Sequence, residues 1–246
     1  MRNILKYPNH WLTEFKEQAV NDYDVLIVGA GISGIGSACH LKMHCPQKNF
    51  KILESRSDLG GTWDLFQYPG IRSDSDMHTL GFSFKPWTDA KAIADGPSIK
   101  SYLKETADDY DLYPHILFNH KVLDYSWSSV SKTWTVSLLE EGQEKSLSCN
   151  FLMICSGYYN YDKGYTPHIE GIENFRGTLV HPQHWPKDLE IDNKKIVVIG
   201  SGATAMTIVP NVAQQASKVT LLQRSPTYVV ARPDQDAIAN FLRKWL

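Results

Sequence analysis

The glycines at Gly29, Gly31 and Gly34 have the spacing of a turn that binds the pyrophosphate of a dinucleotide. The first glycine permits a tight turn, the second lets the pyrophosphate approach the backbone, and the third lets the next helix pack on the strand. Amide groups at the start of that helix bind the phosphates. Glu54 ends the next apolar run, where a carboxylate accepts hydrogen bonds from ribose hydroxyls. These residues predict a site for a dinucleotide without a 2′-phosphate, and they leave FAD and NAD as alternatives.

A second turn of this kind contains Gly200 and Gly202, with Ala205 in the third place. Arg224 follows its second strand, at the position where an NAD site would carry an acid. Because an arginine can pair with a 2′-phosphate that a carboxylate would repel, this second turn predicts an NADP site. FAD in the first site and NADPH in the second is the simplest assignment. The predicted contacts of the second site are Gly200, Gly202, Thr204, Ala205, Arg224 and Ser225.

The loop that begins at Gly60 supplies further candidates for the first site. Gly60 and Gly61 let the backbone approach a flat cofactor, and Trp63 offers a stacking surface. Asp74 is expected to orient a cation or a nicotinamide there. A rigid turn with solvated acids is the alternative explanation of this loop. The predicted contacts of the first site are Gly29, Gly31, Gly34, Glu54, Gly61, Thr62, Trp63, Asp74, Val122 and Gly157.

Short apolar runs and amphipathic segments predict the elements that position these residues. We expect an α/β fold with two Rossmann-like dinucleotide-binding domains and a small antiparallel β excursion, truncated in the second domain. The predicted strands are 24–28, 50–53, 116–118, 121–127, 133–139, 145–148, 151–155, 195–199 and 218–223, and residues 116–148 form the excursion. The predicted helices run to about His44, from 96 to 110, from 203 to about 216, and from 234 onward.

The order of these elements predicts four regions. They are an N-terminal extension (1–20), an FAD-binding domain (21–160), an interdomain linker (161–190) and an incomplete NADPH-binding domain (191–246). Because the second unit has barely two parallel strands, we expect the chain to be the front part of a longer protein. Residues 55–85 are expected to be mostly loop, which is long enough to indicate a function.

The composition narrows the class of protein. The 246 residues, 42% hydrophobic and 21% charged, are typical of a soluble globular protein of one or two domains. A formal charge of −2 and the lack of a Lys/Arg run give no reason to expect bound nucleic acid. No apolar run approaches the about 20 residues of a transmembrane helix, and Pro8 and charged residues interrupt the N-terminus. We expect a cytoplasmic protein.

The four cysteines are Cys39, Cys45, Cys149 and Cys155. They form no C-x-x-C pair, and no histidines stand around them at metal-ligand spacing. We therefore expect no metal site. Cys39 falls in a predicted helix and Cys155 in a predicted core strand, which is typical of buried structural thiols in a reducing compartment.

Two longer patterns resemble those of the type I Baeyer–Villiger monooxygenases, a branch of the flavin-containing monooxygenases. The family fingerprint F-x-G-x-x-x-H-x-x-x-W followed by Pro or Asp is matched by Phe175, Gly177, His181, Trp185 and Pro186. The pattern G-x-W-x-x-x-x-[FY]-P-[GM]-x-x-x-D is matched by Gly61, Trp63, Tyr68, Pro69, Gly70 and Asp74. The segments GGTWDLFQYPGIRSDSDMHTLGF and CSGYYNYD are most similar to the ethionamide-activating monooxygenase subgroup. The resemblance runs from about Asp24 to the last residue.

The resemblance implies an enzyme that uses FAD, NADPH and dioxygen. NADPH reduces the flavin, and the reduced flavin captures dioxygen as a C4a-peroxide that converts a ketone into an ester or oxygenates the sulfur of a thioether or thioamide. His181 is implied to couple the two domains and to affect catalysis without contacting substrate. Asp74 is implied to hold the family's active-site arginine near the flavin. That arginine lies beyond Leu246, and the resemblance assigns its role to neither Arg72 nor Arg232.

Two other classes of protein share part of this pattern. A non-catalytic FAD- and NADP-binding fragment would bind the cofactors without NADPH-dependent turnover. A flavin disulfide reductase shares the two-turn layout but requires a redox cysteine pair after the first glycine loop. Residues 60–76 contain no cysteine, which excludes the reductase.

Overall fold

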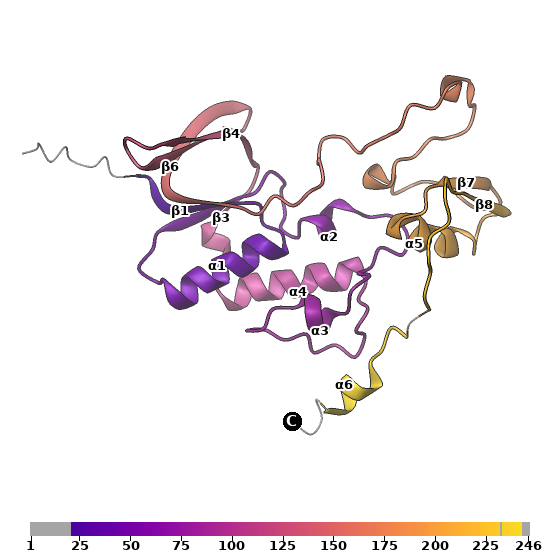
Figure 1. Ribbon diagram of the computed structural model, residues 1–246, viewed down its shortest axis with the longest axis horizontal. Coiled ribbons are helices and arrows are strands. Elements are labelled where there is room, and N and C mark those ends of the chain that lie inside the picture. The colour runs from indigo at the N-terminus through magenta and orange to yellow at the C-terminus, as the bar shows by residue number, and fades with distance from the viewer. Residues whose placement is uncertain (1–20, 232, 243–246) are drawn as a thin grey trace, which may run out of the picture.

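In the computed structural model, which describes residues 21–231 and 233–242, the chain forms two sheets. The larger has six strands in the order β3-β2-β1-β6-β5-β4, and the smaller pairs β7 with β8. Figure 1 shows the larger sheet at one end of the molecule and the smaller at the other. The strands are β1 (Tyr23–Val28), β2 (Phe50–Leu53), β3 (Ile116–Leu117), β4 (His120–Ser128), β5 (Thr133–Glu140), β6 (Gln143–Ile154), β7 (Lys195–Ile199) and β8 (Lys218–Leu222).

Helices α1, α4 and α5 lie in the connections between parallel strands. Helix α1 ends at His44, and β7 begins and ends as predicted, whereas α5 ends at Val212 rather than near 216. The predicted loop 55–85 contains only two four-residue helices, so it is mostly irregular as expected. The helices are α1 (Ile32–His44), α2 (Thr62–Leu65), α3 (Met77–Leu80), α4 (Gly96–Asp109), α5 (Ala203–Val212) and α6 (Ala237–Leu242), with 3₁₀ turns at Tyr113–His115, Ile172–Asn174 and Pro182–His184.

Two expectations about the strands are wrong. Residues 145–148 and 151–155 were predicted as separate strands, but β6 is continuous from Gln143 to Ile154. Its first half pairs antiparallel with β5, and its second half pairs parallel with β1. Strand β3 was assigned to the antiparallel excursion, but it pairs parallel with β2. The antiparallel excursion therefore consists of β4, β5 and the first half of β6.

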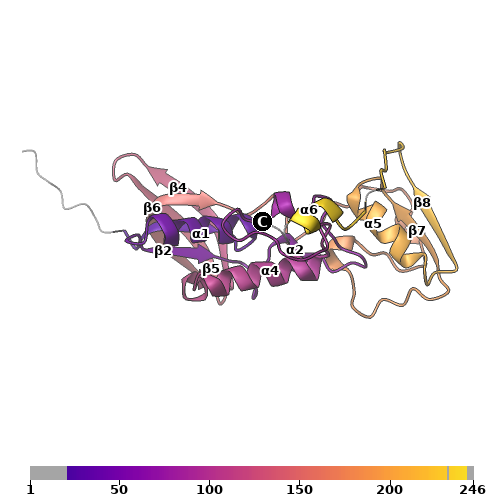
Figure 2. The same ribbon diagram turned by 90° about the horizontal axis from the view of Figure 1, so that it is seen from below.

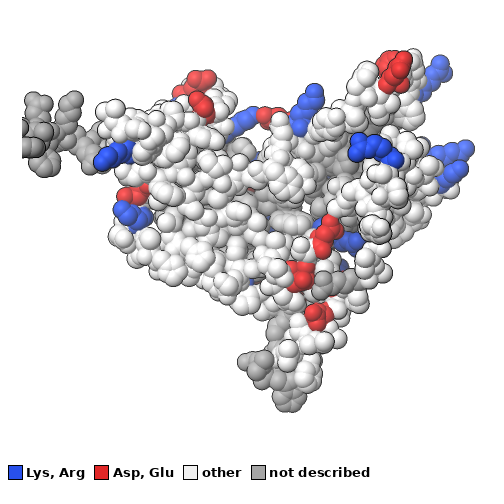
Figure 3. Space-filling model, in the orientation of Figure 1, with Lys and Arg blue, Asp and Glu red and all other residues white. Residues whose placement is uncertain are grey.

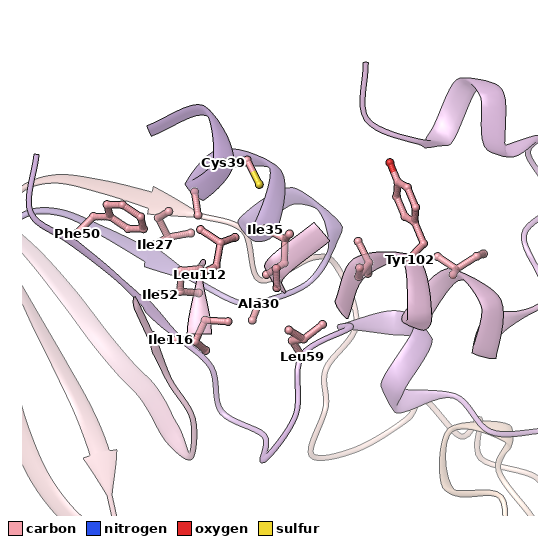
Figure 4. Close-up of a cluster of buried hydrophobic side chains, with 14 of the residues drawn as sticks. Ile27, Ala30, Ile35, Cys39, Phe50, Ile52, Leu59, Tyr102, Leu112 and Ile116 are labelled. Carbon is pink, nitrogen blue, oxygen red and sulfur yellow. The ribbon is translucent and has the colours of Figure 1, made fainter. Parts of the chain in front are cut away.

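The main core lies between the larger sheet and the helices α1 and α4. Figures 1 and 2 show these two helices side by side on one face of the sheet. Figure 4 shows Ile27 and Ile52 from the strands, Ile35 from α1 and Leu112 just after α4, all completely buried. On the opposite face, Leu26 packs with Val136 of β5, so the antiparallel strands curl back over the parallel ones.

A third hydrophobic cluster joins the part of the chain around the larger sheet, the first module, to the part around the smaller sheet, the second module. Leu65 and Phe66, at the end of α2, pack with Ile208 and Val212 of α5, and all four are buried. The partly buried Trp185 of the linker joins this cluster. The division at residues 160 and 190 stays a prediction, although each sheet lies wholly within one of the predicted domains. The predicted N-terminal extension, 1–20, lies outside the described residues.

The chain returns to the first module just before α6. The backbone amide of Ile93 donates to the carbonyl of Asp234 at 3.0 Å, and the side-chain amide of Asn240 donates to the carbonyl of Ala90 at 3.0 Å. The helix that was expected from residue 234 onward begins later, since α6 spans Ala237–Leu242. Residues 243–246 lie outside the described part of the chain. None of the helices in the described part of the chain has the length and apolar character that crossing a membrane requires.

Candidate dinucleotide sites

The first glycine turn connects β1 to α1, and its three glycines are constrained differently. Gly29 has φ +101°, and a Cβ there would lie 2.7 Å from the carbonyl oxygen of Cys155. A Cβ on Gly34 would lie 1.9 Å from the carbonyl oxygen of Gly29. A Cβ on Gly31 would meet only Gly61, at an ordinary 3.5 Å. The fold itself therefore requires Gly29 and Gly34, whereas it leaves room at Gly31.

A cavity of about 490 Å³ opens at this turn, at the carboxyl ends of β1, β2 and β6. This edge of a parallel sheet is where α/β folds bind ligands. Eight of the predicted first-site residues line it, namely Gly29, Gly31, Glu54, Gly61, Thr62, Trp63, Val122 and Gly157. Gly34 lies buried under the turn, where it lets α1 approach β1. Asp74 is exposed on the loop before α3 and is not among the lining residues.

Glu54 is only 3% exposed, and backbone and side-chain donors fix its carboxylate. Its Oε2 accepts a hydrogen bond from the amide of Ala30 at 2.7 Å, which ties it to the glycine turn. Its Oε1 accepts from the amide of Arg56 at 2.9 Å and from the hydroxyl of Ser55 at 3.3 Å. Oε1 already accepts two hydrogen bonds, whereas Oε2 accepts one and can accept another, so Oε2 is the atom available to a ribose hydroxyl.

The cavity also has a wall of aromatic and polar residues that we did not predict. Tyr159, Asn160, Tyr161 and Asp162 follow the end of β6 and line one side. Burial raises the pKa of Tyr161, an effect that the negative charge of Glu54 increases, and burial with the neighbouring Tyr158 raises the pKa of Tyr159 to about 12. Both rings are therefore neutral near neutral pH. Their position directly after a parallel strand was the signal that could have identified them.

An ion-pair network lies next to this wall, where the guanidinium of Arg56 is 6.0 Å from the centroid of the Tyr161 ring. Arg56, a lining residue that we also did not predict, pairs with the buried Asp64 at 2.5 Å. Asp64 in turn pairs with Lys100 of α4 at 2.5 Å, and Lys100 pairs with Asp58 at 2.9 Å. Lys104 completes the network, at 2.7 Å from Asp58. The network fixes the loop after β2 on α4 and thereby holds Arg56 at the cavity.

The second glycine turn connects β7 to α5 in a similar way. Gly200 has φ +145°, and its amide donates to the carbonyl of Leu222 at 3.0 Å. Ala205 is buried, 3.8 Å from where a Cβ of Gly200 would lie, so the third position is filled without a clash. Around Gly202 nothing lies within 4 Å of an added Cβ. Again the middle glycine is the one that the fold itself does not require.

Arg224 and Ser225 follow β8 directly, and both are exposed. Because β7 and β8 are parallel and in register, with Ile199 opposite Leu222, these residues stand at the same sheet edge as the glycine turn. Neither α1 nor α5 carries an acidic residue in its first turn, so no carboxylate there repels a phosphate.

Tyr68 connects the two sets of residues. Burial is the main cause that raises the pKa of this side chain, the charge of Asp74 adds to the rise, and a hydrogen bond with Thr204 opposes it. Thr204 in the second turn thus contacts a side chain of the first module. The loop after Gly60 therefore contacts the second glycine turn through Tyr68. Asp74 lies close enough to Tyr68 for its charge to raise the Tyr68 pKa.

His181 lies in the linker, directly before the 3₁₀ turn Pro182–His184. Its Nδ1 accepts a hydrogen bond from the amide of Gln183 at 3.2 Å, and its ring packs on Gly164. Asp74 and His181 keep their predicted roles as proposals. Two cysteines differ from the expectation, because Cys45 and Cys155 are partly exposed and Cys155 lines the cavity just past β6, while Cys39 and Cys149 are buried.

Comparison with known proteins assigns the family. Residues 22–240 match the flavin-binding monooxygenase-like family, and the chain belongs to that family. It is 58% identical over 224 residues to the FAD-containing monooxygenase EthA of Mycobacterium tuberculosis (strain ATCC 25618 / H37Rv), covering 91% of this chain and 46% of EthA. The chain thus spans about half the length of the curated relatives it matches.

Solved structures agree with the fold. An oxidised steroid monooxygenase bound to NADP is 30% identical with a TM-score of 0.77, covering 91% of this chain and 42% of that one. The OTEMO complex with FAD and NADP is 29% identical with a TM-score of 0.74, covering 85% and 40%. The predicted α/β class and the predicted resemblance to the Baeyer–Villiger monooxygenases are confirmed.

Proposed function

We propose that this chain binds FAD in the cavity at the first glycine turn and NADPH at the second, as part of a flavoprotein monooxygenase. The family, the name of EthA as FAD-containing, and the FAD and NADP in the OTEMO complex support this assignment. The residues fit the cofactors, since Glu54 matches a ribose without 2′-phosphate and Arg224 matches one with it.

One observation carries the proposal. Gly31 and Gly202 both have extended backbone conformations that any residue adopts, and each has room for a Cβ. Neither the backbone nor the packing explains a glycine at these two positions. A pyrophosphate lying against the backbone explains both, because it would occupy the space that a side chain takes.

The proposed reaction is NADPH- and dioxygen-dependent oxygenation of a small molecule. When bound, FAD supplies hydride acceptance and oxygen activation. The substrates that we propose are ketones, converted to esters by Baeyer–Villiger oxidation, and thioethers or thioamides, oxygenated at sulfur. Glu54 orients the adenosine ribose of FAD, and Arg224 selects the 2′-phosphate of NADPH. The oxygen-transfer route stays a prediction of the resemblance.

Asp74 and His181 have proposed roles outside direct cofactor binding. Asp74 would orient a cationic side chain near the flavin, and His181 would couple the linker to both modules. The proposed location is the cytoplasm, supported by the four free thiols at Cys39, Cys45, Cys149 and Cys155.

Anaerobic mixing of the FAD-loaded protein with NADPH tests the proposal. We expect the visible absorbance of the oxidised flavin to be lost, faster with NADPH than with NADH. Admitting air with a thioether should then yield the sulfoxide. Failure to bind FAD would contradict the proposal.

A specific observation favours a second candidate. The chain covers 46% of EthA, so a cofactor-binding part without turnover of its own is the alternative. Flavin that is bound but not reduced by NADPH would support that alternative over the enzyme.

A further inference from the structure

Gln183 is a buried polar side chain at a variable position of the linker fingerprint. It is 5% exposed, whereas Phe175 in the same segment is 57% exposed. Its Nε2 donates a hydrogen bond to the backbone carbonyl oxygen of Asn160 at 2.6 Å, across 23 residues of chain. A buried amide with so short a bond to a distant segment fixes the relative position of the two segments.

The segment that Gln183 holds is the wall of the first cavity. Asn160 lies there between Tyr159 and Tyr161. The Oδ1 of Asn160 accepts from the amide of Asp162 at 3.0 Å, which closes a turn. The carboxylate of Asp162 pairs with Lys121 at 2.6 Å. The wall is thus attached to β4 at one point and to the linker at another.

His181 holds the other side of Gln183. The Nδ1 of the His181 ring accepts a hydrogen bond from the backbone amide of Gln183. A Cβ on Gly164 would lie only 2.2 Å from the ring Cε1, so the ring packs directly against the Gly164 backbone. The amide of His184 donates to the carbonyl of His181 at 2.9 Å, which closes the 3₁₀ turn around Gln183. The fingerprint histidine therefore fixes the backbone whose side chain reaches the cavity wall.

We propose that Gln183 is a positioning residue that holds the cavity wall at Asn160 in the conformation that receives FAD. The inference rests on the proposed function, because it takes FAD as the occupant of this cavity. Without the Gln183 bond, FAD must order the wall when it binds, and that ordering weakens affinity. In the described part of the chain, the hydrogen bonds of Gln183 go to His181 and Asn160 and not to the second glycine turn, so affinity for NADP⁺ should not change.

Cofactor titration of Gln183→Leu and Gln183→Met tests this assignment. Both variants replace the side-chain amide with an uncharged apolar group and remove the donor. We expect FAD to bind about tenfold more weakly to both, while the dissociation constant of NADP⁺ stays within about twofold. Gln214→Met, an exposed change after α5, is the matched control and should behave as wild type. A purely structural role would lower both affinities together, and that result, or unchanged FAD affinity, would overturn the proposal.

A second measurement uses only the wild-type protein and decides the matter if the variants do not fold. Saturating FAD should slow hydrogen exchange of the backbone amide of Gln183. The reason is that the FAD-bound cavity wall stabilises the 3₁₀ turn in which this amide donates to His181. An exchange rate that FAD does not change would reject the role of Gln183 while leaving FAD binding intact. A wild-type protein that binds no FAD would reject the proposed function as well.

Discussion

In the two glycine turns, the individual glycines are present for separate reasons. Gly29 and Gly34 are required by the chain, the first by a positive φ and the second by contact with the Gly29 carbonyl. Gly31 and Gly202 are not, and there the proposed pyrophosphate contact is the reason for a glycine. The sequence pattern identified all four positions but could not separate these causes, because the separation depends on which backbone atoms lie nearby.

Replacement of Arg224 tests the predicted 2′-phosphate contact of the second site. Arg224→Ala should weaken NADP⁺ binding about tenfold or more, because a charge-assisted hydrogen bond to the 2′-phosphate is lost. Binding of NAD⁺, which lacks that phosphate, should change little. Isothermal titration calorimetry measures the dissociation constants of NADP⁺ and NAD⁺ for the wild type and for the variant. Equal weakening of both would show that Arg224 does not contact the 2′-phosphate.

At the scale of the element, local sequence was sufficient for most boundaries but not for pairing. The limits of β2 and β7 and the end of α1 follow from apolar runs and the stop near Pro46. The continuity of β6 does not, because Asn150 disfavours a strand locally and only pairing of Cys149 with both β1 and β5 overrides it. The cavity wall directly after β6 could have been predicted from its place at the end of a parallel strand, but its hydrogen bond with the distant Gln183 could not.

The start of α4 provides a prediction at this scale. Asp95 caps the helix by accepting from the amide of Ser98 at 2.9 Å. Burial alone would raise the pKa of Asp95, but hydrogen bonds from the amide and hydroxyl of Ser98, with the charge of Lys91, bring it below its usual value. A carboxyl whose pKa is lowered on folding stabilises the fold above its unfolded pKa, and this contribution is lost as the pH falls through the folded pKa.

Asp95→Ala should therefore lower the free energy of unfolding by about 1 kcal/mol at neutral pH. Denaturant unfolding at several pH values should show the gap to wild type shrinking as the solution becomes strongly acidic. Asp95→Asn keeps a capping oxygen without the charge and is the control, expected to lie between Asp95→Ala and wild type at neutral pH and to approach wild type in strong acid. A gap that stays constant into the acidic range would contradict the role of the charged cap.

At the scale of the whole molecule, short segments between the modules carry the coupling. Helix α2 presents Thr62 and Trp63 to the cavity, while Leu65 and Phe66 pack on α5 behind the second turn. The linker adds Trp185 to the same cluster. On the face in Figure 3, charged side chains are scattered in small groups of both signs rather than gathered in one patch. The two modules are joined by this apolar packing and by the hydrogen bond between Tyr68 and Thr204. The sequence indicated the junction through the two family patterns, which contain Trp185 and Tyr68.

Reciprocal titration tests whether each glycine turn binds its own dinucleotide. FAD and NADP⁺ are titrated separately into the wild type, Gly31→Ala and Gly202→Ala, with thermal unfolding of each. Both substitutions should leave stability nearly unchanged, because the fold has room for the methyl groups. Gly31→Ala should lose FAD affinity and keep NADP⁺ affinity, and Gly202→Ala should do the reverse. Unchanged affinities in folded variants, or loss of the same cofactor in both, would contradict the account.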